Sequence, residues 1–185
     1  MRPISTPELA TALGVDRWVL DQAISRGIIK APALPAPGAA RAWGFEEAMR
    51  VAAMLRVSAW VPLFGGRARK PAELRDGKLK PAADYYAMAD GRQKDDRTPA
   101  ERIADALAET RLHGFNDDAA FLIVRAIDSN IRTFEARVVR ASALVKAVQR
   151  PLGAAAKRAG ATVAASLLVD LGAIELELLE AWPAE

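Results

Sequence analysis

The chain has 185 residues and a formal net charge of +3, and its composition is 51% hydrophobic and 26% charged. These values are typical of an ordinary soluble protein, and the length allows one full domain or a small domain with an appended module. The absence of cysteine excludes disulfides and thiolate metal sites and fits a reducing compartment. No signal segment opens the chain, and acidic residues interrupt its longest apolar stretch, 161–179, so we expect a cytoplasmic protein.

The charge is distributed unevenly along the chain. Residues 1–100 carry a net charge of +5, whereas residues 101–185 carry −2. Lysine and arginine side chains attract nucleic-acid phosphates whatever the base sequence. The asymmetry therefore favours a DNA-binding region in the N-terminal half and an acidic partner module after it.

The chain opens with two short helices joined by a tight turn, in residues 6–29. Ser5 and Glu8 have the spacing of a capping box for the first helix. Gly14 suits the turn because glycine tolerates positive φ, and Asp16 is placed to cap the second helix. This arrangement is that of a helix–turn–helix motif, in which the second helix enters the major groove; an αα-hairpin of an ordinary helical protein is the alternative.

The second of these helices is amphipathic and ends at Gly27. Its inner face is expected to comprise Val19, Leu20 and Ile24. The residues left on its outer face are Arg17, Asp21, Gln22 and Ser25.

A short wing and a third helix follow. Residues 30–40 contain three prolines and a glycine, which excludes a helix there. Arg41, Trp43 and Phe45 alternate as the residues of a short strand do. A third helix is expected over 46–57, with Met49, Ala52 and Ala53 as its apolar stripe.

This order of elements resembles the DNA-binding domain of the MerR family and its winged-helix relatives, which include excisionases and lambda-type phage small terminase subunits. The matching residues are Thr6, Glu8-Leu9-Ala10, Leu13-Gly14-Val15, Gly27-Ile28-Ile29 and Arg41-Ala-Trp43-Gly-Phe-Glu46-Glu47. The resemblance covers about the first 56 residues and implies a winged helix-turn-helix that binds duplex DNA. Asp21, Gln22 and Ala23 stand where MerR regulators carry an arginine followed by aromatics, so either the docking differs or Asp21 faces elsewhere.

The DNA contacts are predicted from this resemblance and from the polar outer face. Arg17 is the expected base or phosphate contact, and Gln22 can read adenine because its amide bonds that base bidentately. Trp18 belongs either to the groove contact or to the core. Arg41 in the wing is expected to hold phosphate. The predicted DNA-binding set is Asp16, Arg17, Trp18, Asp21, Gln22, Arg26, Lys30, Arg41, Arg67, Arg69 and Lys70.

The middle of the chain is predicted to be a short apolar segment followed by a basic linker. An apolar patch is expected to cover the N-terminal domain; its residues are Trp60, Val61, Leu63 and Phe64. Residues 67–80 form the most basic run, which either follows phosphates or is a solvated linker. Within this run, Asp76-Gly77 between Leu74 and Leu79 signals a β-hairpin. A short helical turn is expected in 81–91, and the polar stretch 92–97 is the best candidate domain boundary.

The remainder of the chain is predicted to be helical. Thr98-Pro-Ala-Glu101 has the features of a helix start, and Ile103, Leu107 and Leu112 are expected to face a core. Apolar residues spaced three and four apart predict one long helix over 117–150 with a coiled-coil seam, and a further helix over 167–182. The dimerisation residues expected on these helices are Val124, Ile127, Ile131, Phe134, Val138, Val145, Leu167, Leu171, Ile174 and Leu178.

These readings predict a mainly α protein. They give a winged helix-turn-helix in 1–66, a basic linker in 67–97 and a helical, coiled-coil-like dimerisation module in 98–185. A helical hairpin that closes within one subunit is the alternative for the last module. Two-fold symmetry would present two winged helices to a pseudo-palindromic site.

Enzyme signatures do not appear in the sequence. His113 is the single histidine, and Gly65-Gly66 lacks the Lys-Ser/Thr that completes a phosphate loop. We therefore expect neither catalysis nor a cofactor or metal. The expected function is that of a dimeric MerR-like transcriptional regulator. The alternatives are a phage small terminase subunit whose C-terminal helices oligomerise and recruit a partner protein, and a nucleoid or plasmid-partition protein.

Overall fold

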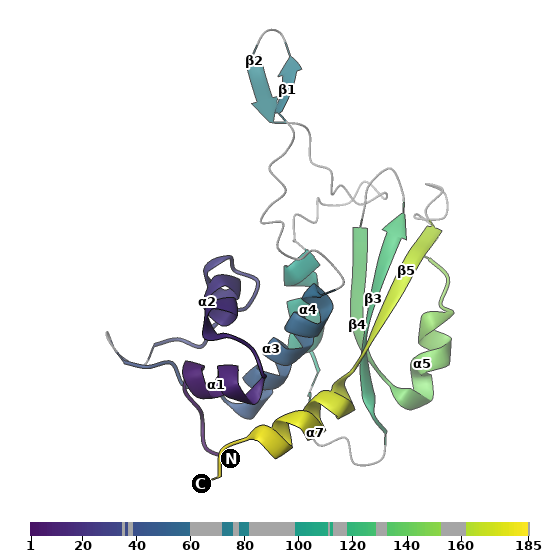
Figure 1. Ribbon diagram of the computed structural model, residues 1–185. Helices are drawn as coiled ribbons and strands as arrows, with labels where there is room; N and C mark the ends of the chain where they lie inside the picture. Colours follow the sequence, from purple (N-terminus) through teal and green to yellow (C-terminus); the bar gives the residue numbers. More distant parts are fainter. Residues whose placement is uncertain are drawn as a thin grey trace.

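The structure is a computed structural model (Figure 1), and it describes residues 1–34, 36, 39–59, 72–75, 78–81, 99–110, 112, 118–128, 133–152 and 162–184. These residues form six helices, a two-stranded sheet and a three-stranded antiparallel sheet. The protein is therefore mixed in secondary structure, and the prediction of a mainly α chain is wrong for its C-terminal half. In the described part of the chain, no helix is long and apolar enough to cross a membrane.

The N-terminal helices form where the sequence predicts them. Helix α1 (Thr6–Ala12) begins with a complete capping box between Ser5 and Glu8, and α2 (Arg17–Ser25) follows after a turn. Gly14 has a φ of 62° in that turn and Gly27 a φ of 70° after α2, both in the left-handed region that glycine enters without strain.

The inner face of α2 differs in detail from the prediction. Leu20 and Ala23 are buried, whereas Val19 and Ile24 are only half-buried. Asp16 occupies the N-cap position with extended backbone, but its side chain makes no capping hydrogen bond.

Helix α3 (Phe45–Ser58) is the central helix of the N-terminal unit. Its apolar stripe includes the expected Met49, Ala52 and Ala53, all of which are buried. The expected wing strand reduces to one antiparallel bridge, between Ile4 and Trp43, because Phe45 already belongs to α3. Pro35, Pro37 and Gly38, in the stretch before the wing, lie outside the described residues.

The hairpin predicted in the basic run is confirmed. Strands β1 (Ala72–Arg75) and β2 (Lys78–Pro81) pair antiparallel, with Leu74 opposite Leu79. The apolar patch at 60–64, the helical turn in 81–91 and the polar boundary at 92–97 lie outside the described residues. Helix α4 (Pro99–Ala108) is also confirmed, and it buries Ile103 and Leu107 as expected.

The long helix predicted over 117–150 is wrong. Its sequence forms strand β3 (Ala120–Asp128), strand β4 (Thr133–Arg140) and only then a helix, α5 (Ala141–Val148). Branched and aromatic residues such as Phe121, Ile123 and Val124 fit a pleated strand better than a helix. Val124 and Val138 of the expected seam lie on neighbouring antiparallel strands, where they are opposite Ala136 and Leu122 and not opposite each other.

Asp118 has a different role from the helix start predicted for it. Its carboxylate accepts hydrogen bonds from the backbone N–H (3.0 Å) and the hydroxyl (2.7 Å) of Ser142, in the first turn of α5. These bonds hold the pKa of Asp118 below its ordinary value. Asp118, which lies two residues before β3, therefore holds the first turn of α5.

The C-terminal stretch is likewise part strand and part helix. Strand β5 (Thr162–Asp170) pairs antiparallel with β3 and completes a sheet in the order β4-β3-β5. Helix α7 (Leu171–Ala181) follows directly, and the side chain of Asp170 caps it through the N–H of Ala173 at 3.0 Å. The single helix predicted over 167–182 is therefore wrong in its first four residues.

One hydrophobic core joins the N-terminal helices to the sheet. It runs from Ile4 and Trp43 through Leu107 and Leu122 to Leu178. Helix α3 contacts both α4 and α7, and α4 covers one face of the sheet while α5 covers the other (Figure 1).

Candidate nucleic-acid interface

Helix α2 carries four of the eleven predicted DNA contacts, which are Arg17, Trp18, Asp21 and Gln22. It lies at the outer end of the N-terminal unit, on the side away from the sheet (Figure 1). Leu20 and Ala23 anchor it in the core that also contains Leu9 and Ala10 of α1. One face of α2 is thus fixed and the opposite face is left to solvent.

The outer face of α2 is exposed as predicted. Arg17, Asp21 and Gln22 are all exposed. The side chain of Trp18 is 58% exposed, so the structure places this tryptophan on the surface and not in the core. An exposed tryptophan beside polar groups offers a flat apolar contact together with one hydrogen-bond donor.

An ion pair on this face involves Asp21. Arg17 Nε lies 3.4 Å from Asp21 Oδ2, one helical turn away. Both side chains are more than half exposed, so this pair contributes little to stability. Asp21 therefore faces the same side as Arg17 and lowers the positive charge that this face presents.

Further cations flank the helix. Arg26 and Lys30 are exposed just after α2, and Arg41 is half-buried close to Trp43 in the chain. Together with Arg17, these four cations outnumber the two acids of the set, Asp16 and Asp21, and leave a net charge of +2. Arg67, Arg69 and Lys70, the remaining predicted contacts, lie outside the described residues.

A buried hydrogen bond fixes α1 against the segment before α3. Trp43 is fully buried, and its Nε1 donates to Thr6 Oγ1 at 3.0 Å. Backbone bonds between Ile4 and Trp43, of 2.9 and 2.8 Å, hold the two segments side by side. The start of α1 and the segment carrying Arg41 are therefore held together.

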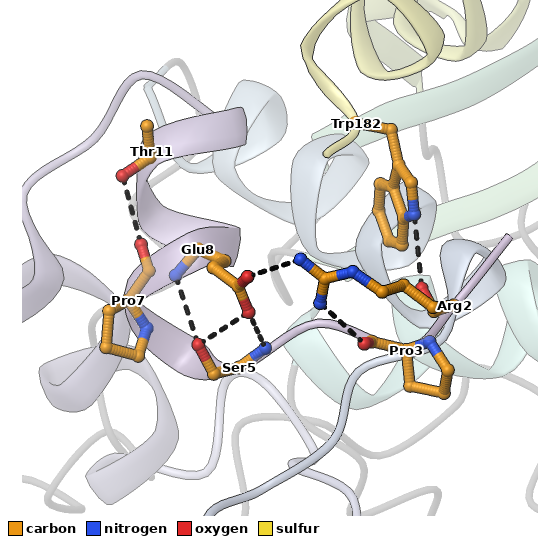
Figure 2. Close-up of polar contacts among 7 residues, drawn as sticks. All are labelled: Arg2, Pro3, Ser5, Pro7, Glu8, Thr11 and Trp182. Atoms are coloured by element: carbon orange, nitrogen blue, oxygen red, sulfur yellow. Dashed lines mark hydrogen bonds and ion pairs between the residues drawn. The ribbon is translucent and has the colours of Figure 1, made fainter. Parts of the chain in front are cut away.

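A polar cluster around Glu8 completes the support of α1, as Figure 2 shows. Glu8 accepts from Arg2 Nη2 at 2.7 Å, from the N–H of Ser5 at 2.7 Å and from the Ser5 hydroxyl at 2.8 Å. The bond from Arg2, followed by those from Ser5, lowers the pKa of Glu8 from 4.5 to about 2. The capping box was predicted, but the contribution of Arg2 was not.

The C-terminal end of the chain reaches the same cluster. Trp182 Nε1 donates to the carbonyl of Arg2 at 3.2 Å (Figure 2), and its ring meets Phe45 edge-on at 5.1 Å between centroids. Trp182 is the last residue of the helix predicted over 167–182, and it packs against the core. It also holds the first residues of the chain.

The predicted dimerisation residues are distributed differently from a helical seam. Val124, Leu171, Ile174 and Leu178 are buried in the core of the chain itself, and Val138 and Leu167 are half-buried against that core. Val145 is 68% exposed on α5. Ile131 lies outside the described residues, as do the side chains of Ile127 and Phe134.

A metal site was also sought among the residues that the structure describes. No group of three or more His, Asp or Glu side chains there is placed to hold a metal ion. His113 and Asp117 lie outside the described part of the chain.

Comparison with known proteins adds no relative. No family model matches the chain, and neither a curated protein nor a solved structure matches it.

Proposed function

We propose that the protein binds duplex DNA through the outer face of α2, as a regulator that resembles the MerR family in its first 56 residues. The proposal includes association of two copies, which would present two such helices to a pseudo-palindromic site.

The observation that carries the proposal is the amphipathic placement of α2. Its inner side chains Leu20 and Ala23 are buried, while Arg17, Trp18 and Gln22 remain exposed on a rigidly anchored helix. A helix anchored on one face and polar on the other, after a tight turn, has the geometry of a recognition helix. Arg26, Lys30 and Arg41, which follow α2 in the chain, would contact phosphates.

The test is a titration of fluorescent duplex DNA of random sequence by anisotropy, at several salt concentrations. The variants are Arg17→Ala, Arg41→Ala and their combination. Each phosphate contact that is removed should lower the slope of log affinity against log salt by about one, so the double variant should lose about two.

A variant of opposite sign sharpens this test. Asp21→Asn removes the carboxylate that pairs with Arg17 and raises the net charge of the face, so it should strengthen duplex binding. Lys146→Ala is the matched control, because this lysine is exposed on α5, far along the chain from the proposed interface. Equal affinities for wild type, Arg17→Ala and Arg41→Ala would contradict the assignment of the interface.

A packaging role, as in a phage small terminase subunit, is the second candidate. It is favoured by the outer face of α7, where Leu176 and Leu179 are exposed beside Glu177 and Glu180. An exposed apolar patch rimmed by polar residues is typical of a surface that binds a protein partner. Light scattering coupled to size exclusion distinguishes the candidates, because a dimer fits a regulator whereas a ring of many subunits fits only packaging.

A further inference from the structure

A cavity of about 530 Å³ lies between α4 and β4, remote in sequence from the proposed DNA contacts. Its walls are one flank of α4 with the two residues that follow it, from Arg102 to Thr110, and four consecutive residues of β4, Glu135 to Val138. Arg150 and Pro151, which follow α5, complete the lining. The volume is within the range of cavities that hold small molecules.

The β4 wall of the cavity is supported by a buried arginine. Arg125 of β3 is 3% exposed, and its Nη1 lies 3.5 Å from Glu135 Oε2. Its Nε makes no hydrogen bond to any described residue. A buried guanidinium requires a counter-charge, and Glu135, which lies opposite Arg125 on the neighbouring strand, supplies it.

Two further arginines line the cavity itself. Arg137 of β4 donates through Nη2 to the carbonyl of Ala147, which fixes its side chain against α5. Burial lowers the pKa of Arg137, and the neighbouring charges of Arg150 and Arg125 lower it further. Glu135 also pairs with Arg125, so its single carboxylate does not balance the charges of Arg137 and Arg150. This end of the cavity is therefore net positive.

The α4 wall carries one guanidinium group, that of Arg102, and two carboxylates. Asp105 and Glu109 line it one helical turn apart. A ligand that fills the cavity would therefore meet Arg137 and Arg150 on one side and, on the other, two carboxylates together with Arg102. Guanidinium groups bind carboxylate and phosphate oxygens bidentately, and carboxylates accept from hydroxyl or ammonium groups.

We propose that this cavity binds a small organic anion that also carries hydroxyl or ammonium groups, with Arg137 and Arg150 holding its anionic group and Asp105 and Glu109 accepting from its donors. The anionic group is a phosphate ester or a carboxylate, since both match the guanidinium fork. The site is separate from α2 and needs no DNA.

The experiment is isothermal titration of the full chain with two probes, glycerol 3-phosphate and citrate, at constant ionic strength. Either probe binding with one-to-one stoichiometry supports the site, and the tighter one identifies the anionic group. Arg150→Ala removes an exposed cation from the lining without disturbing the core, and it should weaken binding roughly tenfold, the effect of losing one charge-assisted hydrogen bond. Arg150→Lys should restore part of the affinity.

Two controls keep this proposal separate from DNA binding. Lys146→Ala removes a cation of α5 that does not line the cavity, so it should leave probe binding unchanged. Arg17→Ala should do the same, whatever its effect on duplex affinity. The proposal is overturned if neither probe binds at millimolar concentration, if Arg150→Ala binds as the wild type does, or if duplex DNA displaces the probe.

Discussion

The N-terminal helices and the C-terminal sheet have similar apolar spacing in sequence but different folds. In residues 6–58, apolar residues three and four apart belong to helices with clear capping signals, and these helices form. In 120–148 the same spacing occurs among branched residues, and there it belongs to two strands and a short helix. Apolar spacing alone therefore does not distinguish a helix seam from paired strands.

The two regions also differ in how they are stabilised. The N-terminal unit has local contacts such as the Ser5–Glu8 capping box, and the buried Trp43–Thr6 hydrogen bond joins its two ends. The sheet depends on contacts between residues far apart in the chain, since β3 pairs with β5 across about forty residues. Substitutions in the two regions can test this difference.

The largest effect is expected at the centre of the N-terminal unit. Trp43→Ala would leave a cavity in the core and remove the partner of Thr6 Oγ1, which should cost about 3–5 kcal/mol of unfolding free energy in urea denaturation. Trp18→Ala is the matched control: because Trp18 is exposed, it should change stability by no more than about 0.5 kcal/mol. A large loss in the control would mean that Trp18 is buried.

A pair of substitutions tests whether the second region is sheet or helix. Ile123 is fully buried on β3, so Ile123→Ala should cost about 2–5 kcal/mol of unfolding free energy. Val145 is exposed on α5, so Val145→Ala should have almost no effect. A continuous helix with the predicted seam would reverse this order, because Val145 lies on that seam and Ile123 does not.

A smaller effect is expected where the two regions meet. Trp182→Ala removes the hydrogen bond to the Arg2 carbonyl and the edge-on contact with Phe45. Together these contacts should contribute about 1–2 kcal/mol to the unfolding free energy. Trp182→Phe keeps the ring but not the donor, so its loss should be intermediate; no loss in Trp182→Ala would mean that the last helix does not hold the N-terminus.

The smallest effect concerns the pH dependence of the α1 cap. The pKa of Glu8 is lowered to about 2 in the folded chain, so its contribution to stability is present above pH 4.5 and is lost as the pH falls toward 2. In Glu8→Gln this part of the acid dependence should disappear from denaturation curves measured between pH 5 and pH 2. Arg2→Ala should reduce it, because Arg2 is the main cause of the shift. Identical pH profiles for wild type and Glu8→Gln would refute this role of the ion pair.

The candidate interface follows the same division between local and distant information. The exposed outer face of α2 could be predicted because amphipathic spacing fixes which side chains point away from a helix core. The ion pair between Arg17 and Asp21 has the four-residue spacing that favours such pairs, so the sequence also contained a signal for it. The sequence contained no such signal for the cavity at β4. Arg125 and Arg137 come together only through the pairing of β3 with β4, and Arg150 joins them only because α5 folds back along that sheet.

The sequence by itself determined the starts of α1, α2, α3 and α4, the two glycine turns, the outer face of α2 and the β1–β2 hairpin. These features depend on contacts within a few residues, where side-chain chemistry and backbone preference decide the result. Only the tertiary structure decided that 120–128, 133–140 and 162–170 are strands, and that Trp182 closes on the first residues of the chain. A strand gains its hydrogen bonds from a distant partner, and a core forms wherever distant apolar faces meet, so neither can be read from one segment alone.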